Sequence, residues 1–209
     1  MSPMPDYGQP LREQDVDADP LRQFAAWSEA ARAAGVREPE AAALATASAD
    51  GAPSVRMLLV KSFDERGFVF FTNYASQKGR ELTANPHASL LFHWDVLGRQ
   101  VRIYGPVERT SFSETVDYVR SRPRKSQLSA LASPQSEVLE SRAALEQRVA
   151  ELEARYDSDE LPTPEDWGGF RLRPATIELW QQRHDRLHDR LRYRHSVERE
   201  GWTIERLAP

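Results

Sequence analysis

A series of short strand patterns separated by turn residues is the feature that most restricts the fold of this chain. Residues 42–48 and 54–63 are predicted strands, and the Asp50-Gly51 pair between them is typical of a tight hairpin. A second turn over residues 64–67 leads to a third predicted strand at 68–72. Three consecutive strands joined by short turns predict an antiparallel meander.

The remaining pattern places single helices between further strands. We expect helices from Asp19-Pro20 to about Gly35, at 76–85, at 111–121 with a Ser111/Glu114 capping box, and over 125–156. Strands are expected near 88–94, 100–107, 169–182, 186–195 and 202–207. This order predicts a mixed α+β fold, mainly antiparallel β, with a mixed barrel and peripheral helices rather than a doubly wound parallel sheet. Residues 1–18 are predicted to form a flexible N-terminal arm, and residues 19–209 a single domain.

Composition excludes several classes of protein. The 209 residues contain no cysteine, which removes disulfides and cysteine nucleophiles, and a net charge of −4 disfavours a general nucleic-acid binder. His184, His188 and His195 lie among arginines that would repel a divalent cation, so no metal site is expected. The N-terminus lacks the apolar core of a signal peptide, and no apolar run approaches the ~20 residues of a membrane span. We therefore expect a cytoplasmic protein.

Motifs for common catalytic folds are also absent, which leaves clusters of basic and polar residues as candidates. The sequence contains no glycine-rich dinucleotide loop, P-loop, zincin helix or nucleophile elbow. Arg56 and Lys61 lie at the two ends of an apolar strand, and Lys78 lies near a predicted helix start that favours phosphate. Tyr118 and Arg122 share a helical face, and Ser126 begins the next turn. When each cluster is taken alone, solvated charges at strand and helix ends explain it at least as well as a binding site does.

A further cluster lies in the stretch 177–193, IELWQQRHDRLHDRLRY. If this stretch is extended, Arg186, His188 and Arg190 point to the same side as Trp180. Two guanidiniums, an imidazole and an indole on one face suit a flat anionic ligand. Gln100, at a predicted strand start, and Gln135-Ser136, at a predicted helix start, complete the candidates.

Taken together and in order, these motifs give the chain a specific resemblance. The sequence carries RMLLVK at 56–61, FFTN at 70–73, SQKG at 76–79, RQV at 99–101, SRPRKSQ at 121–127, PQS at 134–136, WGGFR at 167–171, and ELWQ followed by RLHDR over 178–190. From about Asp19 to Pro209, this combination resembles the pyridoxine/pyridoxamine 5′-phosphate oxidase family.

The resemblance implies an FMN-binding split β-barrel that works as a homodimer, with flavin at the subunit interface. It also implies oxidation of pyridoxamine or pyridoxine 5′-phosphate by O2 to pyridoxal 5′-phosphate and H2O2. The substrate phosphate would be held by Lys61, Tyr118, Arg122 and Ser126, while Arg186 and His188 would lie over the substrate ring as catalytic residues. The implied FMN contacts are Arg56, Met57, Leu58, Leu59, Val60, Lys61, Phe71, Thr72, Gln77, Lys78, Gln100, Gln135, Ser136, Trp180 and Arg190.

Several positions depart from the family pattern. Met4 stands where an arginine often precedes the tyrosine that corresponds to Tyr7, and Gln77 stands where arginine is frequent. Residues 182–185 replace a glycine-containing turn, and Leu131 replaces a usual tryptophan. An alternative is therefore a paralogous flavin oxidase of the phenazine-biosynthetic type. Two further alternatives are a non-catalytic module that binds flavin or pyridoxal phosphate and a nucleic-acid-binding tail at 183–194, which Asp185 and Asp189 interrupt.

Overall fold

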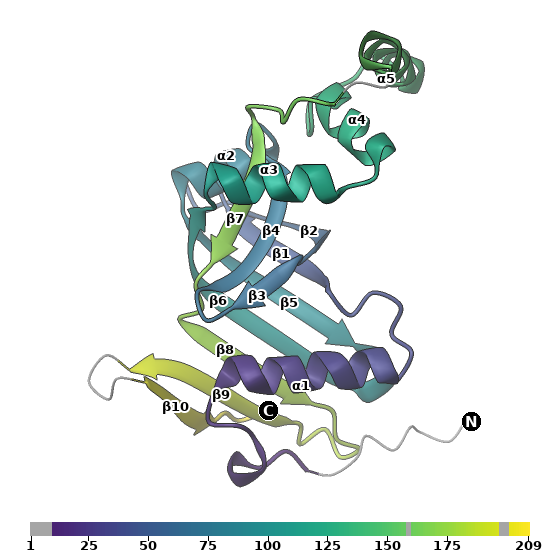
Figure 1. The fold of residues 1–209 in the computed structure, drawn as a ribbon. Coiled ribbons are helices and arrows are strands. Elements are labelled where there is room, and N and C mark those ends of the chain that lie inside the picture. The colour runs from purple at the N-terminus through teal and green to yellow at the C-terminus, as the bar shows by residue number, and fades with distance from the viewer. Residues whose placement is uncertain (1–9, 158–159, 197–200) are drawn as a thin grey trace.

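The computed structural model describes residues 10–157, 160–196 and 201–209, and Figure 1 shows the arrangement of its elements. The strands are β1 (Ala41–Ala47), β2 (Pro53–Leu59), β3 (Ser62–Asp64), β4 (Gly67–Asn73), β5 (His87–Trp94), β6 (Arg99–Arg109), β7 (Trp167–Leu172), β8 (Thr176–Gln181), β9 (Asp189–Ser196) and β10 (Gly201–Arg206). The helices are α1 (Pro20–Ala33), α2 (Gln77–Ala84), α3 (Phe112–Ser121), α4 (Arg124–Ala132) and α5 (Arg142–Tyr156), with short 3₁₀ turns η1 (Glu13–Asp15) and η2 (Asp95–Leu97).

All the strand pairs are antiparallel, and they form one curled sheet. The main path runs β10-β9-β8-β6-β5-β1-β2, while β3 and β7 both pair with β4. The long strand β6 joins the two parts, because residues 99–104 pair with β8 and residues 107–109 pair with β7. The expectation of a mixed, mainly antiparallel α+β fold is confirmed.

The core lies between this sheet and α1. Asp19 caps α1 through a hydrogen bond from the backbone N–H of Leu21, and Pro20 occupies the first turn, as the sequence predicts. The ring of Phe24 meets those of Phe68 and Phe92 at centroid distances of 5.0 and 4.9 Å. These rings are buried, so α1 closes one end of the barrel.

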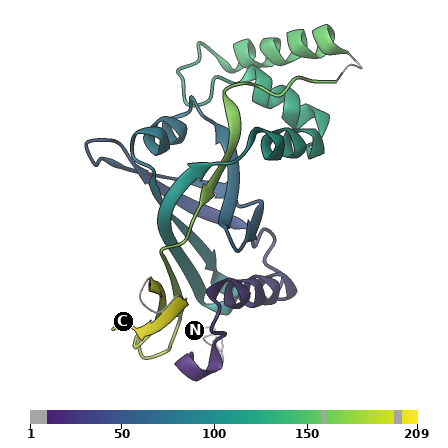
Figure 2. The same ribbon diagram turned by 60° about the vertical axis from the view of Figure 1, so that its left-hand side comes forward.

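The other helices gather at the opposite end of the molecule. Figures 1 and 2 show α2 and α3 beside the end of the sheet that carries β4 and β7, α4 and α5 beyond it, and α1 and the β9–β10 hairpin at the far end. Ser111 and Glu114 form the predicted capping box at the start of α3. The helical end and the hairpin end therefore lie on opposite sides of the barrel.

Three predicted elements are too long. The expected strand 54–63 breaks at Val60 and Lys61, whose backbone N–H groups donate to Glu40 and to Val69 on β4. The expected helix 125–156 is two helices separated by residues 133–141, because Pro134 cannot continue α4. Pro174 likewise divides the expected strand 169–182 into β7 and β8.

The expected strand 186–195 is also wrong at its start. Strand β9 begins at Asp189, and residues 182–188 form a turn in which Arg186 has the positive φ of 62°. Strand alternation therefore does not determine where Arg186 and His188 point. It does hold for Arg190, which pairs directly with Trp180 across β8 and β9.

The described part of the N-terminal arm contacts the C-terminal hairpin. The backbone N–H of Leu11 donates to Asp189 at 3.1 Å, and the hydroxyl of Tyr193 donates to the carbonyl of Asp17 at 2.7 Å. The guanidinium of Arg206 binds Glu13. Residues 1–9, including Tyr7, lie outside the described residues, and the division at residue 18 stays a prediction.

Candidate active site

A pocket of about 760 Å³ opens between the barrel and the helices α3, α4 and α5. All four residues that the resemblance assigns to the substrate phosphate line it. Its walls also carry several residues assigned to FMN. The lining residues that the sequence singles out are Leu59, Lys61, Phe71, Thr72, Tyr118, Arg122, Ser126 and Gln135.

One wall of this pocket is a stack of three nearly parallel rings. Phe71 on β4 stacks on Tyr118 of α3 with a centroid distance of 3.8 Å and an interplanar angle of 11°. Trp167 on β7 lies nearly parallel to both rings, with its centroid 5.8 Å from that of Tyr118 and 6.1 Å from that of Phe71. Trp167 has no role in the sequence prediction, although the WGGFR motif contains it. The flat wall suits an aromatic ligand.

Cationic and hydroxyl groups lie next to this wall. Arg122 ends α3 with its guanidinium 4.8 Å from the centre of the Trp167 ring. Within the described part of the chain, its Nη1 atom is buried and has no hydrogen-bond partner. Burial raises the pKa of Tyr118, although the nearby Arg122 charge opposes the shift. A buried guanidinium nitrogen without an acceptor favours an anionic ligand here.

A second polar group forms where β4, α2 and the α4–α5 loop meet. Lys78 Nζ donates to Gln135 Oε1 at 2.7 Å and to the hydroxyl of Thr72 at 3.2 Å. Ser76 caps α2 by accepting from the backbone N–H of Gly79. Gln135 and Ser136 are not at a helix start as expected, since Pro134 begins a turn in which Ser136 has φ of 74°. Three segments far apart in sequence nevertheless meet here through Thr72, Lys78 and Gln135.

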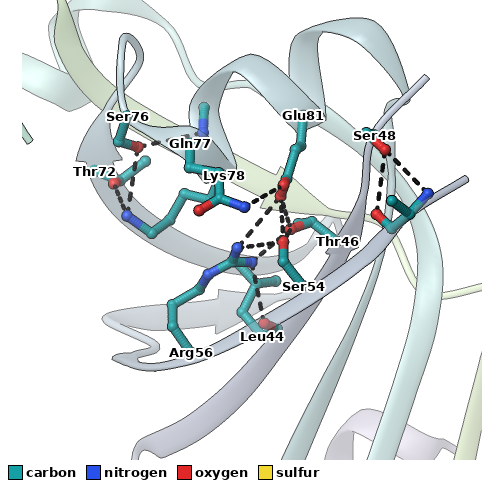
Figure 3. Close-up of polar contacts among 12 residues, drawn as sticks. Leu44, Thr46, Ser48, Ser54, Arg56, Thr72, Ser76, Gln77, Lys78 and Glu81 are labelled. Atoms are coloured by element: carbon teal, nitrogen blue, oxygen red, sulfur yellow. Dashed lines mark hydrogen bonds and ion pairs between the residues drawn. The ribbon is translucent and has the colours of Figure 1, made fainter. Parts of the chain in front are cut away.

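Arg56 joins this region through a network that the sequence analysis missed. Its guanidinium contacts Thr46, Ser54 and Glu81, as Figure 3 shows. Glu81 comes two residues after the SQKG motif and is buried, but a lone carboxylate in a short helix gives no sequence signal. The neighbouring Met57 points the other way and is 66% exposed on β2, which ends the sheet.

The other predicted residues form a separate row across β6, β8 and β9. Gln100 pairs with Trp180, which pairs with Arg190, so all three lie on one face. They line a cavity of about 230 Å³ together with Glu178 and Arg102. Glu178 was also missed, and its carboxylate binds both arginines.

Arg186 and His188 lie beside the same row. The His188 ring is 4.7 Å from that of Trp180, and both line a cavity of about 340 Å³ with Arg186. His188 Nδ1 accepts a hydrogen bond from the backbone N–H of Arg183 at 3.0 Å. Because an accepting ring nitrogen carries no proton, the neutral imidazole presents its N–H at Nε2.

One chain does not bring the two groups together. Arg56 lies on β2 and Trp180 on β8, and three strands, β1, β5 and β6, separate them in the sheet. Four strand spacings amount to roughly 19 Å. The residues assigned to FMN are therefore divided between two faces of the chain.

Two negative findings apply to the described residues. None of the described helices is long and apolar enough to cross a membrane. No group of three or more His, Cys, Asp or Glu side chains in that part of the chain is arranged to hold a metal ion.

The curled antiparallel sheet with peripheral helices defines a split-barrel protein, and comparisons with known proteins name the family. Residues 28–156 match the model described as pyridoxamine 5′-phosphate oxidase, and residues 167–209 match the pyridoxine 5′-phosphate oxidase C-terminal dimerisation region. The pyridoxine/pyridoxamine 5′-phosphate oxidase of Salinibacter ruber is 52% identical, with 95% of this chain and 93% of the relative covered. That of Rubrobacter xylanophilus is 54% identical, with 95% and 91% covered. The chain belongs to the pyridoxine/pyridoxamine 5′-phosphate oxidase family and is an oxidoreductase.

Solved structures confirm the FMN-binding split-barrel fold. The structure of PhzG from Burkholderia lata, in complex with tetrahydrophenazine-1-carboxylic acid, superposes with a TM-score of 0.89 at 38% identity, covering 95% of this chain and 98% of that one. A pyridoxamine 5′-phosphate oxidase-related, FMN-binding protein from Nostoc punctiforme gives a TM-score of 0.70 at 19% identity, covering 91% and 98%.

Proposed function

We propose that the protein oxidises pyridoxamine 5′-phosphate and pyridoxine 5′-phosphate with O2 to pyridoxal 5′-phosphate and H2O2, with FMN as cofactor; the amine substrate also consumes water and releases ammonia. The observation that carries this proposal is the large pocket at the helical end. Lys61, Arg122 and Ser126 line it beside the flat ring of Tyr118, and Arg122 has a buried nitrogen without an acceptor in the described chain. A phosphorylated aromatic ring matches both features.

The residues also fit FMN. Arg56 and Lys78 supply positive charge beside the capped start of α2, which suits the phosphate. Trp180, Gln100 and Arg190 supply a flat and polar surface for the ring system. Because one chain separates these two groups, we infer that a homodimer completes the site, one group coming from each subunit. The match of residues 167–209 to a dimerisation region supports this inference.

The protein's part in the reaction is to bind and orient the substrate. Bound FMN would supply the redox chemistry, as acceptor of a hydride equivalent from the substrate and donor of electrons to O2. Lys61, Tyr118, Arg122 and Ser126 hold the substrate phosphate, which fixes one end of the molecule. Arg186 and the Nε2–H of His188 contact the ring at the other end, so that the reacting carbon faces the cofactor.

A second candidate is a flavin oxidase acting on a phenazine precursor. The 38% identity and close superposition with PhzG support it. A carboxylated phenazine precursor has no phosphate and would not need the full set of Lys61, Tyr118, Arg122 and Ser126 around one anion, which is why the vitamin B6 substrates are preferred.

The decisive experiment uses the purified protein under air. We expect a flavin absorption spectrum and, after addition of pyridoxamine 5′-phosphate, equal amounts of pyridoxal 5′-phosphate and peroxide. A yellow protein that forms neither product would favour the phenazine-type oxidase. A protein that takes up no FMN would contradict both candidates and leave a non-catalytic role.

A further inference from the structure

Glu81 is a buried carboxylate to which the reaction proposed above gives no role. It lies on α2 with a side chain that is 9% exposed. The hydroxyls of Thr46 and Ser54 donate to its Oε2 at 2.5 and 2.6 Å, and the Gln77 amide donates to its Oε1 at 2.8 Å (Figure 3). Arg56 Nη2 lies 3.3 Å from the same Oε2. Four donors from three elements therefore converge on one carboxylate.

This environment keeps Glu81 ionised. Burial alone would raise its pKa, but hydrogen bonds from Ser54, Thr46 and Gln77, together with the Arg56 charge, lower the pKa to about 2. A carboxylate that accepts several hydrogen bonds is stabilised in its charged form. Glu81 is thus a permanent negative charge next to two residues assigned to the FMN phosphate.

The same network fixes the Arg56 guanidinium. Nη1 donates to the hydroxyl of Thr46 at 2.5 Å and to the carbonyl of Leu44 at 3.3 Å, while Nη2 donates to Ser54 at 2.6 Å and to Glu81. Because both terminal nitrogens have partners on β1, β2 and α2, the guanidinium has little freedom to rotate. Its orientation is therefore set by the protein before a ligand binds.

Lys78 lies on the same short helix as Glu81 and interacts electrostatically with the charges of both Arg56 and Glu81. Burial and the Arg56 charge together lower the pKa of Lys78 to about 8, and the Glu81 charge opposes this shift. Without Glu81, two neighbouring cations would repel each other in a partly buried site.

We propose that Glu81 is a positioning residue that holds Arg56 beside Lys78, so that the two cations bind the phosphate of FMN as a pair. The inference rests on the proposed function, because it requires that this pair binds the phosphate of FMN. Glu81 itself does not touch the ligand. It acts through Arg56, with Thr46 and Ser54 as shared hydrogen-bonding partners.

The direction in which FMN affinity changes when the Glu81 charge is removed distinguishes a positioning role from simple Coulomb repulsion. A negative charge near a phosphate repels it, so removal of that charge would strengthen FMN binding if Coulomb repulsion dominated. Positioning predicts the opposite, because an unfixed Arg56 loses its hydrogen bonds and its orientation. Hydrogen bonds to charged groups contribute enough to expect FMN affinity to fall about 10- to 100-fold.

The test compares FMN with riboflavin, which has the same ring system but no phosphate. Both flavins are titrated into full-length, flavin-free protein carrying Glu81→Ala, Glu81→Gln or no change. We expect each variant to weaken FMN binding and to leave riboflavin binding unchanged. In an Arg56→Ala background, Glu81→Ala should have little further effect, because the residue acts through that arginine. Glu81→Gln keeps the side-chain size and serves as the measured variant if the alanine protein does not fold.

Glu114→Gln is the matched control. Glu114 also pairs with a buried arginine, Arg171, at 2.7 Å. It lies at the start of α3, outside the two groups of residues that are assigned to FMN. This variant should leave the ratio of FMN to riboflavin affinity unchanged. Equal losses for both flavins, or tighter FMN binding, in the Glu81 variants would overturn the positioning role. If the unchanged protein binds neither flavin, the proposed function itself fails, whereas normal FMN binding with an unaffected ratio in the variants contradicts only this inference.

Discussion

Glu178 holds Arg190 through two nitrogens of its guanidinium. Nε and Nη2 of Arg190 lie 2.9 and 2.7 Å from Oε1 of Glu178, whose side chain is only 7% exposed. The second oxygen of Glu178 accepts from Arg102. Since Trp180 follows Glu178 on the same face of β8, this carboxylate fixes the arginine that lies opposite the indole.

Glu178→Ala should therefore destabilise the protein and weaken FMN binding. Removing one partner of a buried pair leaves the other charge unpaired, but the partial exposure of Arg190 reduces the penalty to about 2 kcal/mol. For a chain of this size, that corresponds to a fall in Tm of roughly 4–8 °C, measurable by thermal unfolding. Glu205→Gln is the matched control, because its pair with Arg192 is more than one-third exposed and should contribute less than about 1 kcal/mol.

FMN affinity should fall as pH rises above about 8, because Lys78 loses its charge there. Burial and the Arg56 charge lower the pKa of Lys78 to about 8 in the free protein, whereas a bound phosphate favours the protonated form. Flavin-free protein is titrated with FMN at fixed pH values between 6.5 and 9.5. We expect log Kd for FMN to rise by up to about one unit per pH unit. Lys78→Arg keeps its charge, so its affinity should not follow this profile, and an identical profile in that variant would assign the effect to another group.

The stability of the flavin-free protein should rise with pH above about 8, whereas FMN affinity falls. The folded pKa of Lys78, about 8, is below the ordinary lysine pKa of 10.5, so the unfolded state binds more protons between these pH values. The free energy of unfolding from this group therefore rises with pH across that window. Denaturant unfolding of the wild type and of Lys78→Met at pH 7 and pH 9.5 measures the contribution of Lys78 to the free energy of unfolding. We expect the difference in free energy of unfolding between the two proteins to be smaller at pH 9.5 than at pH 7.

Much of the fold could be predicted because the signals are local. Asp50-Gly51, the Ser111/Glu114 capping box and the Asp19-Pro20 helix start each depend on neighbours in the sequence, and all three appear in the structure. The errors arose where a proline divided a uniform pattern, as at Pro134 and Pro174. Such breaks depend on where the chain must turn to pack, which periodicity does not encode.

The ordered motifs indicated candidate site residues, but they did not indicate the residues that support them. Lys61, Tyr118, Arg122 and Ser126 line one pocket, and their role in binding stays a prediction. Glu81 and Glu178 were missed because each acts on an arginine from a different element, 25 and 12 residues away. Tertiary contacts of this kind leave no periodic pattern in a single sequence.

Gly79→Ala should destabilise the turn that presents Lys78. A Cβ at this position would lie 2.2 Å from the carbonyl oxygen of Tyr74 and 2.7 Å from that of Asn73, and backbone atoms cannot move aside cheaply. We expect a loss of at least about 1–3 kcal/mol by denaturant unfolding, together with reduced flavin content. Arg80→Ala, at the next and exposed position of α2, should change stability by less than about 0.5 kcal/mol. Equal stability of the two variants would contradict the packing argument.

Tyr118 should contribute to substrate binding through its hydroxyl and to pocket shape through its ring. Tyr118→Phe keeps the 3.8 Å stack on Phe71, so KM for pyridoxamine 5′-phosphate should rise about 10-fold while flavin content and Tm stay unchanged. Tyr118→Leu removes the stack as well and should lower Tm by a few degrees. Steady-state kinetics and thermal unfolding of both variants separate these roles, and an unchanged KM in the phenylalanine variant would remove the hydroxyl from the phosphate site.

Arg186→Ala should reduce turnover and substrate affinity while FMN stays bound. Arg186 is exposed in the 182–188 turn, outside the strands, where it lines the cavity shared with Trp180 and His188. The positive φ of 62° strains any residue that has a Cβ. Alanine is therefore under the same backbone strain as arginine, and the substitution removes only the charged side chain. We expect kcat/KM to fall about 100-fold or more, with unchanged flavin absorbance after gel filtration. Loss of FMN with normal turnover in reconstituted protein would instead assign Arg186 to the cofactor, and would make the turn at 182–185 a flavin-binding rather than a substrate-binding element.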